Sequence, residues 1–204
     1  MMFLMVHLTI NLLLLFGDGE IFNRAAGFMG SNPVMKVIEP ILAIGFILHI
    51  IYAGYITLKN RMARPQSYKV ASKSEASWAS KNMFILGGLI LVFLVIHIAN
   101  FFWKVKFGHV ALISYDGGMT EMHDTYALVA CLFKGSICYN VLYITGAIFL
   151  FLHLTHGFWS AFQTIGWGNE KWTSRLKTIS YIYAIVIAGG FALIPMYFII
   201  KYFV

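Results

Sequence analysis

The sequence has few charged residues and few cysteines. Only 11% of its 204 residues are charged, whereas a soluble domain has about 25%. Because 60% of the residues are hydrophobic, the composition excludes a disordered chain and an ordinary cytosolic domain. The two cysteines, Cys131 and Cys138, are too few for a disulfide scaffold and match no zinc-binding spacing. On one helix they would lie about 10 Å apart, too far for a disulfide. What remains is an integral membrane protein the size of one helical bundle.

Five apolar segments predict transmembrane helices. They cover residues 1–16, about 34–58, 83–103, 139–162 and 178–203. The last four each reach the roughly 20 residues that cross a bilayer core. The first is shorter and has neither the basic start nor the cleavage site of a signal peptide. We therefore expect the sequence to begin inside a helix, with roughly 15–25 residues missing before it. The expected fold is all-α: one domain, residues 1–204, forming a transmembrane bundle of five helices.

The positive charges lie mainly on one side of this bundle. The connections 59–82 and 163–177 carry nine basic and two acidic residues, whereas the opposite side has six of each. The positive-inside rule makes the basic side cytoplasmic, so the N-terminus lies inside and the C-terminus outside. The net charge of +7 thus reflects topology, and no dense basic run indicates nucleic-acid binding. On the outer side, residues 123–134 are expected to form a short helix along the membrane interface.

Most of the histidines lie inside the predicted spans, where ionisable residues are rare and by default indicate function. Five of the seven do so: His7, His49, His97, His153 and His156. His109 and His123 fall in the outer loop and need no special explanation. A proton relay would require carboxylates near the histidines, and the spans hold almost none apart from Glu39.

Four of these histidines occupy two depths. At about 1.5 Å per residue, His7 and His97 lie about 9–14 Å below the outer face, and His49 and His153 about 15 Å from the inner face. Imidazole nitrogen is a good iron ligand and facing helices often hold cofactors, so each pair predicts one bis-histidine haem. The alternative for a single histidine is a buried polar side chain hydrogen-bonded across helices. Four histidines, one per helix and paired in depth, favour haem.

Two further patterns bear on this prediction. His153 and His156 lie on one helix face, so either can be the iron ligand while the other bonds a propionate or a backbone group. The depths of His153 and His156 in the membrane are too similar to decide which of them is the iron ligand. Glycines would let a flat macrocycle approach the helix backbone. They occur in the spans at positions 45, 54, 87, 88 and 146.

The order of several segments resembles that of a known family. The segments are HLTINLLLLF at His7, FNRAAGFMG at Phe22, LHIIYAGYITLKNRMARPQSY around His49, SWASKNMFILGG at Ser77, LVIHIANFFW at His97 and FLHLTHGFWSAFQTIGW at His153. Along nearly its whole length the sequence resembles the cytochrome b membrane anchor of succinate dehydrogenase and fumarate reductase complexes, in its single-chain form with five spans and two b haems. The resemblance implies His7 and His97 as ligands of the distal haem. It implies His49 and His153 as ligands of the proximal haem, and favours His153 over His156.

The resemblance also implies partners and a location. An anchor of this family docks a flavoprotein subunit and an iron–sulfur subunit on its cytoplasmic face, in the bacterial cytoplasmic membrane. Electrons then pass between the iron–sulfur clusters and membrane quinone, here expected to be menaquinone. Ser77, Trp78, Ser80 and Lys81 are candidates for contacting the propionates of the inner haem. Trp78 has the equal alternative of an aromatic residue at the membrane interface.

Glu39 is the candidate for proton exchange at the quinone site near the distal haem. Its alternative is a carboxylate that reaches back to the interface, and Asp18 and Glu20 are other options. Some relatives carry a relay carboxylate two residues before the fourth haem ligand. In this sequence that position is Phe151, so we expect no relay there.

Two other functions remain open. One is a cytochrome b anchor for another quinone-linked dehydrogenase, such as a hydrogenase or formate dehydrogenase. The other is a transporter or structural anchor without a cofactor. A transporter would be expected to show internal repeats or broken helices, and the sequence has no internal repeat.

Overall fold

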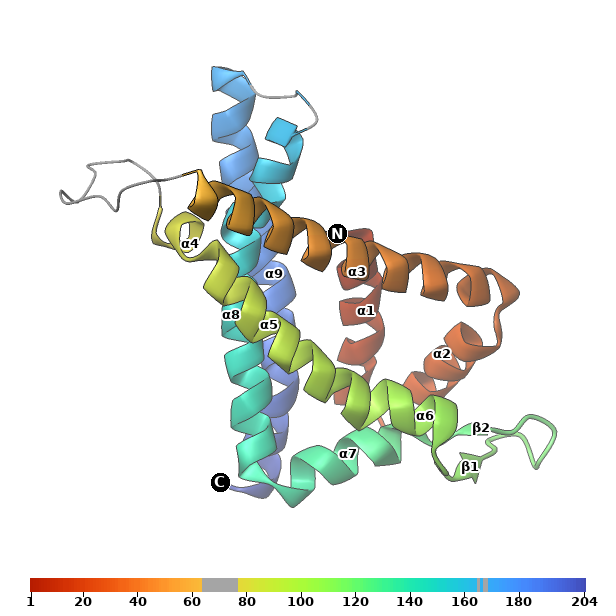
Figure 1. Cartoon of the computed structure of the whole chain (residues 1–204). Helices are drawn as coiled ribbons and strands as arrows, with labels where there is room; N and C mark the ends of the chain where they lie inside the picture. The colour runs from red at the N-terminus through yellow and green to blue at the C-terminus, as the bar shows by residue number, and fades with distance from the viewer. Residues whose placement is uncertain (64–76, 165, 167–168) are drawn as a thin grey trace.

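The computed structural model of the chain describes residues 1–63, 77–164, 166 and 169–204. These residues form an all-α fold with one small pair of strands (Figure 1). Part of the predicted cytoplasmic charge, namely Arg64, Lys69, Lys73 and Glu75, lies outside the described residues.

Four helices in the described ranges are long and apolar enough to cross a membrane. They are α3 (Pro33–Met62), the continuous rod of α5 (Met83–His97), η2 (Ile98–Phe102) and α6 (Trp103–Phe107), then α8 (Ile137–Thr164) and α9 (Glu170–Tyr202). The four full-length spans predicted from hydropathy are thus confirmed as helices. The helices extend beyond the apolar runs into polar sequence, because capping residues determine where each helix begins and ends. Asn169, for example, accepts a hydrogen bond from the Trp172 amide at 2.9 Å and starts α9 well before the apolar run.

The first predicted segment forms a shorter apolar helix. It consists of α1 (Met2–Leu12) continued by the 3-10 turn η1 (Leu13–Leu15). The polar connection after it is also largely helical, since α2 (Glu20–Ser31) fills most of the expected loop. A single turn, α4 (Trp78–Lys81), precedes α5.

The expected short helix of the outer connection is confirmed as α7 (Thr125–Gly135). Asp124 caps it by accepting a hydrogen bond from the Ala127 amide at 3.0 Å. Before it, β1 (Leu112–Ile113) and β2 (Met122–His123) pair antiparallel, which the sequence did not predict. In Figure 1, α7 runs crosswise to α8 and α9 at the end of the bundle that holds the C-terminus.

The core is centred on the antiparallel hairpin of α8 and α9, which lie side by side (Figure 1). Ser180 on α9 is fully buried, and its Oγ lies 2.8 and 2.9 Å from the Leu154 and Thr155 carbonyl oxygens of α8. α1 packs on α9 where Leu8 lies against Gly190. A second cluster of buried side chains lies near the C-terminal end of α9 and includes Phe133 of α7 and Phe198 of α9.

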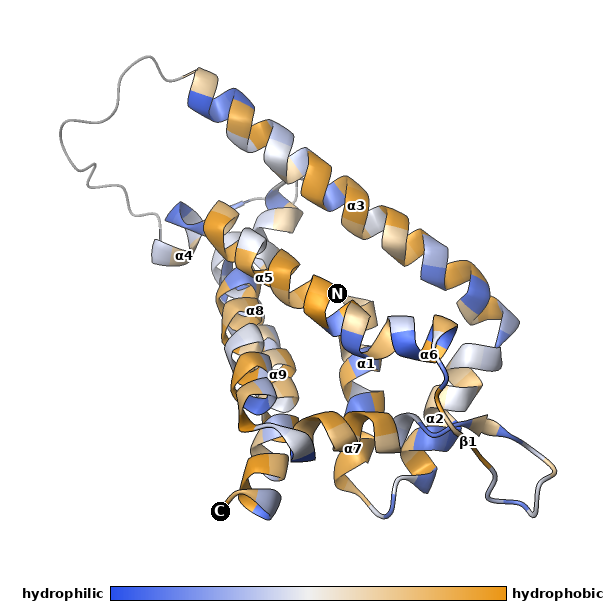
Figure 2. Ribbon diagram, turned by 60° about the horizontal axis from the view of Figure 1, so that its bottom comes forward, coloured by the Kyte–Doolittle hydropathy of each residue, from blue (hydrophilic) through white to orange (hydrophobic). Residues whose placement is uncertain are grey.

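α3 differs from the other long helices because none of its residues is buried. Hydrophobic residues nevertheless fill its middle, as Figure 2 shows. Two contacts hold its ends. The Arg61 guanidinium lies 5.6 Å from the centre of the Phe84 ring on α5, and Glu39 forms a 3.1 Å ion pair with Lys106 on α6. α3 is therefore a helix held at both ends, with apolar surface exposed between them.

Candidate functional site

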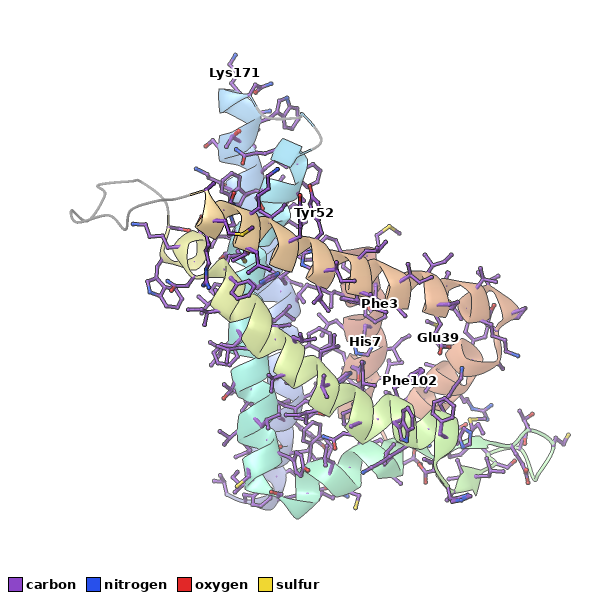
Figure 3. The ribbon with its side chains drawn as sticks, viewed as in Figure 1. Phe3, His7, Glu39, Tyr52, Phe102 and Lys171 are labelled. Carbon is purple, nitrogen blue, oxygen red and sulfur yellow. The ribbon has the colours of Figure 1, made fainter. Side chains whose placement is uncertain are left out.

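The first histidine pair joins α1 to α5. The ring centres of His7 and His97 are 5.8 Å apart and their planes are nearly perpendicular, at 87°. Figure 3 shows Phe3 and His7 one turn apart on α1. Phe3 stacks on the His7 ring at 5.2 Å, and Phe191 of α9 lies 5.6 Å away on another side. Helical periodicity places Phe3 and His7 on one face, so α1 presents both to the same space.

Aromatic side chains also surround His97. Phe93 and Phe101, one turn before and after it on the same rod, lie 5.9 and 5.3 Å from its ring centre. Tyr143 of α8 lies 5.9 Å away. The first pair therefore lies in an apolar, aromatic environment that excludes water.

The second pair joins α3 to α8. His49 and His153 have ring centres 6.3 Å apart and planes at 84°. His156 lies elsewhere, with its ring 5.0 Å from that of Trp159 on the same helix. The structure thus brings His153, rather than His156, to His49.

The two pairs lie at different levels along α5. A Cβ added to Gly87 would lie 3.8 Å from Cε1 of His153. His97 follows ten residues later on the same helix, so about 15 Å of helix axis separates the two levels. The two depths inferred from the sequence therefore correspond to two separate pairs of facing rings.

Hydrogen bonding does not explain these histidines. The Nδ1 atoms of His97 and His153 are buried and have no hydrogen-bond partner among the described residues. The Nδ1 of His7 lies 3.4 Å from the Asn11 side chain, one turn along the same helix. A buried polar side chain normally has a partner, and one without a partner requires an explanation. The alternative of ordinary cross-helix hydrogen bonding is therefore not what positions these rings.

The geometry of each pair fits two imidazoles that share one metal. An imidazole nitrogen binds a first-row metal at about 2 Å, so rings on opposite sides of one ion have centres roughly 6 Å apart. Among the described residues, no group of three or more His, Cys, Asp or Glu is placed to bind a metal. A metal held by one of these pairs would take its other ligands from outside the protein, as an iron porphyrin provides them.

The span glycines fall into two groups. A Cβ at Gly45, Gly54 or Gly88 would have nothing within 4 Å, so these positions leave open surface on α3 and α5. Gly45 lies one turn before His49 and shares its face, where a flat ligand could lie against the backbone. At Gly146, by contrast, an added Cβ would collide with the Phe93 ring. The reason for glycine at that position is helix packing.

Tyr143 and Asn100 are site residues that the sequence reasoning missed. The Asn100 Nδ2 donates to the Tyr143 hydroxyl at 3.2 Å, joining the rod to α8 beside His97. Asn100 lies in η2, a turn of π-helix that begins directly after His97. Such turns are rare and occur often at functional sites. The sequence could have indicated Tyr143, because this residue lies two to three helical turns before His153 and therefore at the depth of His97.

The propionate candidates gather at α4. Ser77 caps this turn, its Oγ accepting a hydrogen bond from the Ser80 amide at 3.2 Å. Trp78 is 63% exposed, which fits an interface aromatic, and Lys81 is exposed as well. The structure thus places the four residues on one turn near α8, with the Ser77 hydroxyl engaged in capping.

The three carboxylate candidates for the quinone site differ in the contacts that they make. Glu39 on α3 pairs with Lys106 on α6, and both side chains are about half exposed. Figure 3 shows Glu39 on the same side of α3 as Phe102 and His7. Glu20 instead pairs with Arg24 at 2.7 Å, and Asp18 accepts a hydrogen bond from the Glu20 amide. Of the three, Glu39 alone makes a side-chain contact between long helices.

The described basic residues of the predicted cytoplasmic side lie in the last turns of α3, in α4 and in the first turns of α9. Those described are Lys59, Arg61, Lys81, Lys171, Arg175 and Lys177. Figure 3 labels Lys171 at the tip of α9, at the opposite end from α7. Tryptophans accompany two of these cations: Arg175 lies 5.4 Å from the ring centre of Trp172, and Lys177 lies 4.9 Å from that of Trp159.

Comparison with known proteins found no matching family model, no matching curated protein and no matching solved structure.

Proposed function

We propose that the chain is a dihaem cytochrome b that anchors a succinate:quinone oxidoreductase, a succinate dehydrogenase or fumarate reductase, in the bacterial cytoplasmic membrane. The observation that supports this most strongly is the pairing of His7 with His97 and of His49 with His153. Their ring centres are 5.8 and 6.3 Å apart, at two levels of one helical bundle. In this proposal α1 is part of a fifth span, and the five helices enclose both haems.

The residues of the chain would set the properties of each haem. A bound haem supplies an iron that accepts and releases one electron. His7 and His97 would hold the distal haem, and His49 and His153 the proximal one. A haem held by two histidines would serve electron transfer rather than oxygen binding. Around His97, aromatic side chains exclude water, and exclusion of water is one of the factors by which a protein sets a haem potential.

The arrangement supports a path from one membrane face to the other. The His49–His153 pair lies nearer the basic end, where the iron–sulfur and flavoprotein subunits would dock. Charge complementarity would guide that docking. The topology rule alone accounts for the charges, so the docking proposal rests on the resemblance. The His7–His97 pair lies nearer the opposite end, where electrons would be exchanged with quinone, expected to be menaquinone.

Glu39 is our candidate for the proton exchange that accompanies quinone chemistry. Its carboxylate lies 3.1 Å from the Lys106 ammonium, and both side chains remain accessible at the end of α3. This assignment stays a proposal, as does contact of Ser77, Trp78, Ser80, Lys81 or His156 with the proximal haem.

The test is purification of the tagged chain from its native membranes with its partners, followed by mass spectrometry and spectroscopy. We expect a flavoprotein and an iron–sulfur protein to co-purify, and succinate to reduce b haem in the complex. Copurification of a hydrogenase or formate dehydrogenase, with haem reduced by hydrogen or formate, would contradict the succinate assignment. A preparation without haem would contradict the cytochrome assignment itself.

A further inference from the structure

Two lysines converge on one tyrosine at the end of the bundle that holds α7. Lys134 Nζ lies 4.7 Å from the centre of the Tyr202 ring, and Lys201 Nζ lies 5.6 Å from it. Lys201 also donates to the Tyr197 hydroxyl at 2.8 Å. The lysines come from different elements, α7 and α9, whose C-terminal ends meet there (Figure 1). The fold thus gathers two positive charges that are far apart in the sequence.

These charges have no acidic partner among the described residues. In the part of the chain that the structure describes, the carboxylates in ion pairs belong to Glu20 and Glu39, which pair with Arg24 and Lys106. Lys134 and Lys201 therefore meet no carboxylate at ion-pair distance. Each lies in the last turn of its helix, where the helix dipole favours a cation. That preference explains one lysine per helix, but it does not explain two ammonium groups beside the same ring.

The surroundings match the headgroup level of a bilayer. Tyr197 and Tyr202 lie near the end of a predicted span, where tyrosine is enriched at the membrane–water interface. Both lysines are exposed, so a lipid can reach them. Lysine side chains close to a membrane surface attract the phosphates of anionic lipids. A phosphate offers several acceptor oxygens to lysine ammonium groups, and exposed apolar side chains such as Ile200 and Phe203 lie close by in the sequence.

We propose that Lys134 and Lys201, supported by Tyr197 and Tyr202, form a binding site for the phosphate headgroup of an anionic phospholipid. The site lies on α7 and α9 and uses none of the histidines or carboxylates assigned to electron transfer. It therefore holds whether or not the chain binds haem.

The test uses the full chain in neutral detergent and native mass spectrometry with added phosphatidylglycerol or phosphatidylcholine. We expect phosphatidylglycerol to be retained in preference to phosphatidylcholine. The double variant Lys134→Gln with Lys201→Gln should lose this preference by roughly thirtyfold, the loss expected for two basic side chains at a charged lipid surface. The matched control, Lys36→Gln with Lys104→Gln, removes the same charge elsewhere and should bind like the parent.

A conservative variant separates binding from folding. Lys134→Arg with Lys201→Arg keeps both charges and should retain the lipid even if the glutamine variant unfolds. Three results would overturn the proposal: equal retention of both lipids by the parent, unchanged retention by a folded glutamine variant, or loss of lipid in a folded arginine variant. Displacement of the lipid by millimolar inorganic phosphate would also contradict it, because that result would identify a site for the free ion.

Discussion

The ring of His49 faces the ring of His153 at 6.3 Å, although no residue of α3 is buried. The two histidines are thus the place where the middle of an exposed helix meets the α8–α9 hairpin. A contact between an exposed imidazole and a partly buried one whose Nδ1 has no hydrogen-bond partner among the described residues gives little stabilisation by itself. We propose that a ligand shared by His49 and His153 is the reason why α3 and α8 meet at these two residues.

Replacing His49 by alanine should remove one haem and leave the other. The substitution removes one of the two histidines that would hold the proximal haem, while His7 and His97 remain together on α1 and α5. We expect haem content to fall by half, measured by pyridine haemochrome on the purified protein. His109→Ala is the control, because His109 is exposed in the connection after α6, and it should keep both haems. Loss of both haems in His49→Ala would contradict independent sites.

Removing the hydroxyl of Tyr143 should weaken the bundle beside His97. Tyr143→Phe leaves the Asn100 amide without its 3.2 Å acceptor. We expect the free energy of unfolding to fall by about 1 kcal/mol, as for a typical hydrogen bond. Denaturation in mixed detergent micelles measures this change. Tyr139→Phe, on an exposed ring of the same helix, should leave the stability unchanged. Equal effects from both variants would show that the hydrogen bond does not contribute.

Asn23 should be among the most sensitive polar residues. It is fully buried, donates to the Tyr115 hydroxyl and the Asp124 carboxylate at 2.9 Å, and accepts from the Tyr126 amide at 2.8 Å. Asn23→Ala removes three hydrogen bonds, so we expect a loss of about 3 kcal/mol.

The neighbouring exposed ion pair provides the control for Asn23. Glu20→Ala removes only its 2.7 Å contact with Arg24 and should cost less than about 1 kcal/mol. Both variants can be compared in the same denaturation experiment. Similar losses for Asn23→Ala and Glu20→Ala would contradict the role of the buried network in joining α2 to α7.

Gly146→Ala should destabilise the contact between α5 and α8. The new methyl group would collide with the Phe93 ring, and overpacking of this kind costs about 1–3 kcal/mol. Gly189→Ala on α9 is the matched control, because a Cβ there meets nothing within 4 Å. It should be neutral or slightly stabilising. A Gly146→Ala protein as stable as the parent would show that α5 and α8 separate readily.

The sequence predicted the parts of the fold that depend on hydropathy and helix period. Four long helices and α7 follow from apolar runs and an N-cap residue, and the depth of each histidine follows from counting along its helix. Counting did not separate His153 from His156, because both lie on one helix face. Their difference appears only when α3 is placed against α8.

Other features depended on tertiary contacts that no local pattern contains. The π-turn after His97 places Asn100 opposite Tyr143, and Glu39 meets Lys106 only because α3 begins beside α6. Gly146 was expected to leave room for a macrocycle, but the Phe93 ring occupies the space beside it. Glu39 and Gly146 were recognisable in the sequence, but their partners were not, and Asn100 was not recognised at all.

The most direct test of the central claim is the haem content of the purified full chain. A reduced-minus-oxidised spectrum should show low-spin b haem, and the pyridine haemochrome assay should give two haems per chain. One haem per chain would contradict the pairing of four histidines into two sites. A protein that folds and binds no haem would contradict the cytochrome assignment as a whole.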